Sequence, residues 1–282
     1  MLAVILPARA AGQPAGQAPE TSGPAVTTEL RTQFGVSYNN PGLQQSLEWS
    51  RRRLLRPGTG ALTADAHLAF GSQVTLSPSY VRVSAWGQVA PVSFLTVRLG
   101  VEPAHYFGTF DSLMSFDRQD EPFDNDSRRD RGGAASARVL RVFATPSLRG
   151  RVGHLTALVS GDVERWVASA PGPWFYEPTR DTLLDTGGDD VLASRAVVMY
   201  EHVTAAGTRL GVGGIHTFQQ VDGRALNQVQ RLGVISTLQS DGRWHFLRRP
   251  AVNVIVARYL DDPSKDGGVF AALTVATTVH RR

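Results

Sequence analysis

The chain has 282 residues, of which 42% are hydrophobic and 19% charged, and no apolar run approaches the roughly eighteen residues of a membrane-spanning helix. The composition therefore excludes a helical membrane protein, and the absence of cysteine excludes disulfide frameworks and cysteine-ligated metal sites. The formal charge of +4 comes from arginines scattered along the chain, with no basic run interleaved with aromatic residues, so the sequence predicts no binding to nucleic acid.

The N-terminal segment has features of an export signal. Residues 2–6 are apolar, and the small residues that follow include Ala8-Arg9-Ala10, an A-x-A cleavage pattern. Residues 12–26 are rich in Pro, Gly, Ala and Gln, a composition typical of disordered segments. We therefore predict that residues 1–27 are a signal-peptide remnant with a disordered lead-in, and that residues 28–282 form one domain.

Strand-like segments recur from residue 28 onward. The first two are predicted over residues 30–39 and 43–54, joined by a turn of Asn, Asn, Pro and Gly. The third has the clearest two-residue period. Its predicted apolar face consists of Leu62, Ala64, Ala66, Leu68 and Phe70.

Further strands follow with the same alternation of apolar and polar residues. A hairpin is predicted over residues 141–166, with its turn at residues 146–150, where Pro, Ser and Gly occur. The chain then holds about twelve strands in total. The remaining ones are predicted over residues 80–89, 92–107, 191–203, 208–218, 227–239, 246–260 and 268–280.

The connections between these strands differ in length. Two are long and polar, residues 108–133 and 169–190, and both follow odd-numbered strands. The connections after even-numbered strands are brief, as at residues 90–91 and 205–207, and residues 240–242 are also predicted to be a short turn. An even number of strands, with short turns at one end and long loops at the other, is typical of a membrane-spanning β-barrel.

Over residues 28–280 this pattern resembles bacterial outer-membrane β-barrel proteins as a general class. The resemblance implies an all-β fold, a single antiparallel transmembrane barrel with periplasmic turns and extracellular loops, in contact with outer-membrane lipid and lipopolysaccharide. Aromatic residues near the strand ends are predicted to form girdles at the two membrane interfaces. At the loop end these are Tyr80, Tyr106, Phe107, Trp166, Phe218 and Tyr259, and at the turn end Phe94, Trp244 and Phe246.

Ionisable residues opposite the apolar faces are predicted to line the lumen, because a charge facing hydrocarbon near the midplane costs about 2–4 kcal/mol. They could form Arg–carboxylate pairs that plug the barrel, or a charged path for small solutes or ions. The loop half is predicted to hold Arg82, Glu102, Asp162, Glu164 and Arg231, the middle Arg98, and the turn half Asp65, His67 and His154.

The main functional prediction is a small passive, porin-like channel. An outer-membrane hydrolase acting on lipid or peptide is one alternative, but no catalytic residue is assigned, because none of the seven histidines has a serine two residues later. His154-Leu155-Thr156 comes nearest, and a pair such as Asp162 and Glu164 more often forms salt bridges. A non-conducting binding or scaffold barrel is the other alternative. Its partner surface would be the aromatic residues Trp174, Phe175 and Tyr176 of the second long loop.

No cofactor or metal site is predicted. The stretch Asp124-Asn125-Asp126-Ser127 has the density of oxygen ligands of a calcium loop. It lacks the glycine turn and the terminal glutamate of such a loop, so the sequence favours a solvated acidic segment.

Overall fold

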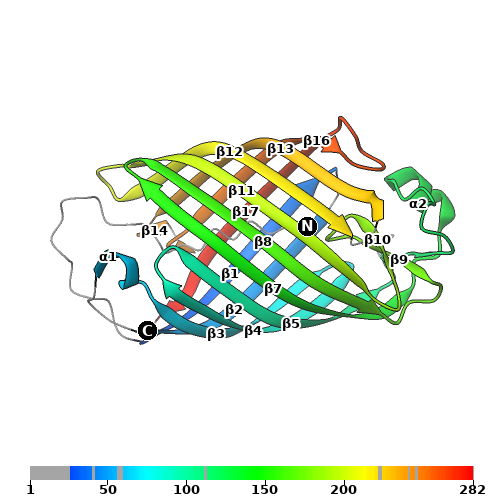
Figure 1. Ribbon diagram of the computed structural model, residues 1–282, viewed down its shortest axis with the longest axis horizontal. Coiled ribbons are helices and arrows are strands. Elements are labelled where there is room, and N and C mark those ends of the chain that lie inside the picture. The colour runs from blue at the N-terminus through cyan, green and yellow to red at the C-terminus, as the bar shows by residue number, and fades with distance from the viewer. Residues whose placement is uncertain are drawn as a thin grey trace.

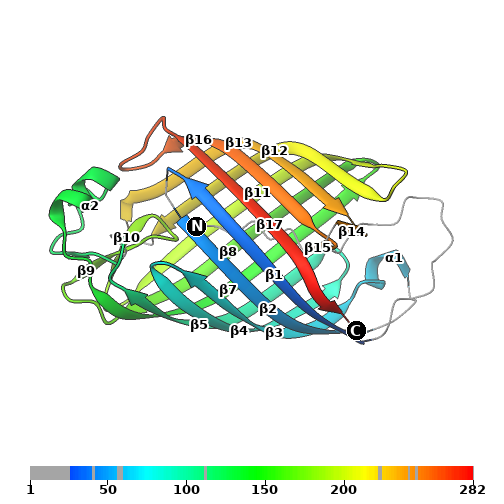
Figure 2. The same ribbon diagram turned by 180° about the vertical axis from the view of Figure 1, so that it is seen from behind.

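The computed structural model describes residues 26–281 except 40–41, 56–59, 111–112, 222–223, 241 and 245–246. Within these residues, twelve long strands form one closed antiparallel barrel, and pairing between the first and the last strand completes the ring (Figures 1 and 2). The predicted all-β barrel of about twelve strands is confirmed. In chain order the strands are β1 (Val26–Tyr38), β2 (Gly42–Leu54), β3 (His67–Ser77), β4 (Tyr80–Val92), β5 (Leu95–Phe107), β7 (Ser136–Val152), β8 (Leu155–Ala168), β11 (Asp189–Val203), β12 (Thr208–Val221), β13 (Arg224–Ser240), β16 (Ala251–Asp261) and β17 (Val269–Arg281).

The barrel is apolar outside, and its interior holds polar and charged side chains together with a cluster of buried apolar ones centred on β11, β12, β13 and β16. On β3, the outward side chains Leu68, Phe70 and Leu76 are 49%, 53% and 54% exposed, whereas Gln73 and Thr75 point into the lumen. A protein in water would bury such an apolar face, because exposed apolar surface is unfavourable there. The outer surface is therefore suited to hydrocarbon, and the part of the interior that includes Gln73 and Thr75 to water and charge. Among the described residues, no helix is long and apolar enough to cross a membrane.

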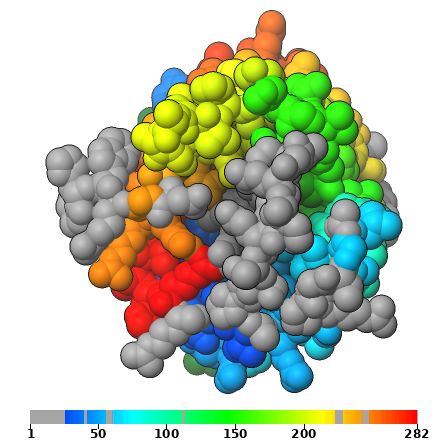
Figure 3. All heavy atoms as spheres, turned by 90° about the vertical axis from the view of Figure 1, so that its left-hand side faces the viewer, coloured from blue at the N-terminus to red at the C-terminus, as the bar shows by residue number. Residues whose placement is uncertain are grey.

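The two ends of the barrel differ in their connections. One end, on the left in Figure 1, carries the turns at residues 93–94, 153–154 and 204–207 and the last residues of β17. Figure 3 looks onto this end, with the β7–β8 turn in green and the β11–β12 turn in yellow at its rim. The opposite end carries the long loops 108–135 and 169–188. We call these the turn end and the loop end.

The predicted hairpin turn at residues 146–150 is wrong. These residues lie inside β7, and the turn consists of Gly153 and His154. Pro146 suggested a turn, but the strand continues through it, with the β7–β8 ladder interrupted at residues 145–146. Gly153 provides the left-handed conformation that the true turn needs, with φ at 58°.

Three other predicted boundaries are also wrong. The third strand starts at His67, because the residues before it include the short helix α1 (Gly60–Thr63). Residues 241–250 are not a short turn but include the strands β14 (Arg243–Trp244) and β15 (Leu247–Arg248). Conversely, only residues 222–223 separate β12 from β13, because both strands extend beyond their predicted ends at residues 218 and 227. Of the predicted lead-in, residues 26–27 belong to β1 and residues 1–25 lie outside the described part of the chain.

The first long loop contains β6 (Ser115–Phe116) and the helix α2 (Asn125–Arg131). Asp124 caps this helix, since its Oδ1 accepts hydrogen bonds from the backbone amides of Asp126 and Ser127, both at 3.0 Å. The acidic stretch that resembled a calcium loop is therefore a helix N-cap. In the part of the chain that the structure describes, no group of three or more His, Asp or Glu residues is arranged to hold a metal ion.

Candidate functional site

The second long loop folds back into the loop end of the barrel as a hairpin. Its strands β9 (Trp174–Glu177) and β10 (Thr182–Asp185) pair with each other, and β9 also pairs with β6. We call residues 169–188 the inserted hairpin. In Figure 1 it lies within the right-hand end of the barrel, with α2 beyond it.

Both faces of the inserted hairpin are buried. Phe175 and Leu184 lie opposite each other and pack into a cluster with the inner wall, which includes Tyr106 and Trp166. The next cross-strand pair, Tyr176 and Leu183, faces the first long loop. The hairpin therefore closes the mouth with apolar contacts on two sides. This second cluster contains Tyr176, Leu183, Met114, Phe116 and Phe123.

The tip of the hairpin is tied to the wall by charged groups. Glu177 accepts a hydrogen bond from Arg82 Nη2 at 2.7 Å on one carboxylate oxygen and from the Tyr106 hydroxyl at 2.6 Å on the other. Arg180 Nε donates to Glu164 Oε2 at 2.8 Å. The tip thus contacts β4, β5 and β8, on one side of the lumen.

The opposite side of the tip is anchored by Asp181. This residue forms an ion pair with Lys265, in the loop between β16 and β17, and accepts a hydrogen bond from the Tyr176 hydroxyl at 2.7 Å. The Arg180 carbonyl oxygen accepts a hydrogen bond from the Gln219 side chain on β12 at 2.7 Å. Contacts on both sides of the lumen therefore hold the hairpin across the mouth.

The carboxylates of the tip are stabilised in their ionised form. Burial opposes ionisation of Glu177, but the Arg82 charge and the hydrogen bonds from Thr179 and Tyr106 outweigh it and hold its pKa below the ordinary 4.5. Burial likewise opposes ionisation of Asp181, and the Lys265 ammonium outweighs it and holds its pKa below 3.8. Both anchors are therefore charged at neutral pH.

Acidic and basic side chains alternate beneath the hairpin, and we call this series the ion-pair ladder. Arg141 contacts Glu102 at 3.0 Å and Glu164 at 2.6 Å, and Arg82 lies 3.5 Å from Glu102. Each guanidinium in the series contacts two carboxylates, so none of these buried charges is unpaired. In order, the ladder is Glu177, Arg82, Glu102, Arg141, Glu164, Arg180 and Asp162.

Four aromatic residues predicted to form the outer girdle point into the lumen instead. Tyr80, Tyr106, Trp166 and Tyr259 are at most 5% exposed. The Tyr106 hydroxyl and the Trp166 indole N–H donate to the carboxylates of Glu177 and Glu164, at 2.6 Å and 2.9 Å. The Tyr80 hydroxyl donates to the Gln44 side chain, and the Tyr259 hydroxyl to the Asn39 carbonyl oxygen, both at 3.0 Å. The Arg82 guanidinium also lies 4.4 Å from the centre of the Tyr80 ring. Phe107 and Phe94 are 43% and 45% exposed, Phe218 is partly exposed, and nothing is described for the side chains of Trp244 and Phe246.

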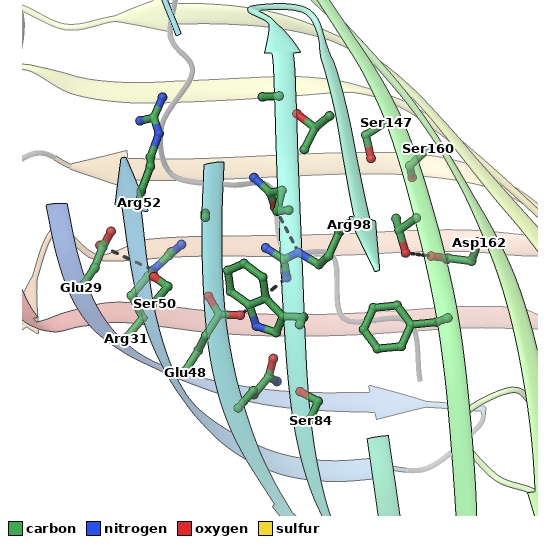
Figure 4. Close-up of a pocket in the computed structure, with 18 of the residues that line it drawn as sticks. Glu29, Arg31, Glu48, Ser50, Arg52, Ser84, Arg98, Ser147, Ser160 and Asp162 are labelled. Atoms are coloured by element: carbon green, nitrogen blue, oxygen red, sulfur yellow. Dashed lines mark hydrogen bonds and ion pairs between the residues drawn. The ribbon is translucent and has the colours of Figure 1, made fainter. Parts of the chain in front are cut away.

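Below the ladder the lumen is hollow. A cavity of about 460 Å³ extends toward the turn end, and Thr179 and Arg180 of the hairpin tip form part of its lining. On its wall, Arg98 stacks on the Trp86 ring at 3.9 Å and lies 3.7 Å from Glu48 (Figure 4). The hairpin and the ladder therefore separate this cavity from the loop end.

The cavity lining carries an excess of positive charge. Its described residues include ten arginines and five carboxylates, a difference of five. Each carboxylate (Glu29, Glu48, Asp65, Glu102 and Asp162) lies within 4.0 Å of a guanidinium nitrogen. Four arginines have no ion pair with any other described residue. They are Arg149, Arg195, Arg249 and Arg281.

Most of the residues predicted to line the lumen point into it. Glu164 belongs to the ladder, and the Arg231 guanidinium lies over the rings of Phe270 and Tyr259 at 4.6 Å and 5.2 Å. The remaining ones, except His154, line the cavity itself. These are Asp65, His67, Arg82, Arg98, Glu102 and Asp162.

Two predicted placements are corrected by the structure. His154 is exposed in the β7–β8 turn, next to the Tyr200 ring, because the turn lies later in the chain than predicted. Of the aromatic residues expected on an exposed loop surface, Phe175 and Tyr176 are at most 1% exposed and Trp174 is only partly exposed. They are buried because their loop folds into the barrel and does not project from it.

Several residues of the site were not predicted from the sequence. Arg141 could have been found, because it alternates with the outward residues Leu140 and Val142. Arg195 was obscured by the apolar residues on its own inward face. Glu177 and Arg180 lie in a loop, where no periodicity indicates which side chains turn inward.

A closed antiparallel barrel with an apolar exterior, charged groups inside and its long loops at one end is an outer-membrane β-barrel. The protein therefore lies in the bacterial outer membrane. No family model matches the sequence, and no curated protein matches it.

Solved structures of outer-membrane barrels are similar to this chain in fold only. The NanC porin is 11% identical, with a TM-score of 0.40, over 88% of this chain and 97% of that chain. The KdgM porin is 9% identical, with a TM-score of 0.41, over 89% and 99%. The beta domain of the Bordetella autotransporter Brka is 8% identical, with a TM-score of 0.45, over 90% and 98%.

Proposed function

We propose that the protein is a passive outer-membrane channel for small solutes, which the inserted hairpin closes at the loop end. The observation that carries this proposal is the charged cavity inside the barrel, whose lining includes Thr179 and Arg180 of the hairpin tip. Toward the loop end of the barrel, the cavity ends at the tip of the inserted hairpin and at the ion-pair ladder. Displacing the hairpin would remove the apolar seal and two members of the ladder, Glu177 and Arg180.

The hairpin can leave the mouth without disrupting the wall. Among the described residues, β9 pairs with β10 and with β6, and neither β9 nor β10 pairs with a strand of the barrel wall. Its base is narrow, because the Thr186 amide donates to the Pro173 carbonyl oxygen at 3.0 Å. Moving it out of the mouth would therefore leave the hydrogen-bond ladders between the wall strands intact.

The geometry favours a channel over a hydrolase. Asp162 and Glu164, the carboxylates that a hydrolytic site would use, are engaged by guanidinium groups. Among the described residues, no ion pair joins a histidine to a carboxylate. A catalytic site would require a base placed beside a nucleophile or a bound water.

Single-channel recording in planar bilayers tests the proposal. Residues 174–185 are excised and Pro173 is joined to Thr186 through two glycines, which the narrow base permits. We expect rare or small openings from the full chain and stable, larger openings from the excised variant. Because rings of charge select ions, both should prefer anions.

A matched control changes exposed charges in the other long loop. Asp126 and Arg129 pair on the outer face of α2 with side chains 87% and 74% exposed, so Asp126→Asn with Arg129→Gln leaves the inserted hairpin in place. This variant should conduct like the full chain. Silent membranes at high protein load, for both the full chain and the excised variant, would contradict a channel.

A further inference from the structure

Four side chains form a row across the inner wall of the cavity. Thr96 on β5 lies opposite Ser147 on β7, Ser147 opposite Ser160 on β8, and Ser160 opposite Arg195 on β11. All four line the cavity, and Figure 4 shows Ser147 and Ser160 side by side. Directly opposite side chains are about 5 Å apart, so the row is about 15 Å long.

Arg195 is buried without an anionic partner. It is 9% exposed, forms no ion pair or hydrogen bond with another described residue, and its buried Nε has no acceptor. Asp162, on the neighbouring strand, is already engaged, because it lies 3.8 Å from Arg180 and accepts a hydrogen bond from Thr145 at 2.6 Å. An uncompensated buried charge is unfavourable, so this guanidinium is available for an anion from solution.

The three hydroxyl groups of the row are also available. The side chains of Thr96, Ser147 and Ser160 form no hydrogen bond with another described residue, and each is partly exposed to the cavity. A hydroxyl can both donate and accept a hydrogen bond. The row therefore presents one cationic fork followed by three groups that can bond the hydroxyls of a solute.

We propose that this row binds small hydroxylated carboxylates, with the carboxylate on Arg195 and the hydroxyls of the solute along Ser160, Ser147 and Thr96. The guanidinium fork matches the planar carboxylate. A cavity of about 460 Å³ falls within the size range of pockets for small molecules. This inference rests on the proposed function, because it names the class of solute that the channel would admit.

The unpaired arginines are arranged to bring such an anion inward. Arg149 lies on the same wall, opposite Leu158, two residues along β8 from Ser160 in the direction of the turn end. Arg249 and Arg281 line the cavity from segments close to the turn end. An anion entering from the turn end would therefore meet unpaired guanidinium groups before it reaches Arg195.

Calorimetric titration of the full chain, folded in detergent, tests the site with three probes at constant ionic strength. Gluconate carries a carboxylate and a chain of hydroxyls, sorbitol carries only the hydroxyls, and acetate carries only the carboxylate. We expect gluconate to bind at least about tenfold more tightly than either of the others, because each of them lacks one kind of contact. Equal binding of sorbitol would overturn the role of Arg195, and equal binding of acetate the role of the hydroxyl row.

Variants separate this site from general attraction of anions. Arg195→Gln should weaken gluconate binding at least about tenfold, and the double change Ser147→Ala with Ser160→Ala should weaken it several-fold. Arg165→Gln is the matched control, since Arg165 is a half-exposed arginine on β8 that pairs with Asp190 and does not line the cavity. Unchanged affinity in Arg195→Gln, or an equal loss in Arg165→Gln, would overturn the proposal.

Folding of each variant is checked by heat-modifiable migration on a detergent gel. Arg195→Gln removes an unpaired buried charge and should keep the barrel fold. A protein that conducts ions but shows no binding that depends on Arg195 overturns the site and leaves the channel. One that binds gluconate through Arg195 but never conducts supports the site and contradicts the channel.

Discussion

The two halves of the lumen differ in how many carboxylates each arginine contacts. In the loop half, Arg82, Arg141 and Arg180 each contact two carboxylates and take part in the closure of the mouth. In the turn half, Arg52 and Arg98 each contact a single carboxylate, and Arg149, like Arg195 near mid-barrel, contacts none and lines open space. The inserted hairpin accounts for part of the difference, because Glu177 adds a carboxylate to the loop half and Arg180 bridges two others.

This contrast shows that one charged lumen can hold both a structural plug and a path for solutes. A guanidinium that bridges two carboxylates holds the wall strands and the hairpin together, and removing one partner leaves an uncompensated charge. A guanidinium without a partner contributes little to the fold and is available to a solute. Changing charges in the two halves should therefore have different consequences, which three of four experiments test.

The largest effect is expected from Glu164→Gln. Glu164 is 1% exposed and contacts both Arg141 and Arg180, so its neutralisation leaves two buried guanidinium groups with weaker partners. We expect a loss of about 3 kcal/mol in the free energy of unfolding, measured by urea titration in detergent. The double change Glu164→Gln with Arg180→Gln should recover part of this loss. A loss below about 1 kcal/mol in the single variant would show that the ladder is not a structural unit.

The second effect is the opening of the mouth at acid pH. Glu177 and Asp181 have pKa values in the folded state below their ordinary values of 4.5 and 3.8. Their contribution to hairpin docking is therefore fully present above those ordinary values and is lost as the pH falls through the lowered ones. Asp262 has the opposite pH dependence, because burial and the charge of Asp181 raise its pKa above 3.8. Its contribution to stability is present at low pH and is lost as the pH rises through the raised pKa.

Conductance measured against pH tests this second prediction. The opening frequency of the full chain should be constant near neutrality and rise only at acid pH, as the pH falls through the lowered pKa values of Glu177 and Asp181. The variant without residues 174–185 lacks both groups and should show no such rise. Acid-induced opening in that variant as well would assign the effect to the wall and not to the hairpin.

The third experiment concerns how the turn half is kept hollow. The Trp86 ring contacts Gly71, where an added Cβ would be 2.5 Å from the ring and 2.5 Å from the Trp49 carbonyl oxygen. Gly71→Ala should force the ring into the cavity and cost about 1–3 kcal/mol of unfolding free energy. Gly87→Ala is the matched control, because a Cβ there meets nothing within 4 Å. Equal stability of the two variants would show that the Trp86 ring can move without cost.

The sequence predicted the wall of the barrel better than its contents. Along the wall, each strand alternates between lipid and lumen, so outward residues such as Phe70 and inward ones such as Arg82 follow from a period of two. The hairpin follows no such period, and whether Tyr176 projects outward or packs inward depends on contacts with Phe123 in a distant loop. Arg195 is paired or free according to side chains on other strands, which periodicity does not specify.

The aromatic residues near the loop end show another limit of prediction from the sequence. Position along the strand predicted an interfacial girdle, and that position alone does not distinguish a ring facing lipid from one facing the lumen. Tyr106 and Phe107 are neighbours, yet Tyr106 is fully buried and Phe107 is 43% exposed. The alternation within β5 decides between them, and the Tyr106 hydroxyl then bonds Glu177.

The smallest effect is expected from Glu48→Gln in the turn half. Glu48 lies 3.7 Å from Arg98, and both side chains keep contact with the cavity, at 17% and 30% exposure. Solvent screens this pair, and Arg98 retains its stacking on Trp86, so the unfolding free energy should fall by less than about 1 kcal/mol. The freed guanidinium would add a cation to the lumen and shift the reversal potential further toward anions. A loss of stability as large as that of Glu164→Gln would show that the two halves do not differ, since the turn half would then depend on its ion pairs as the loop half does.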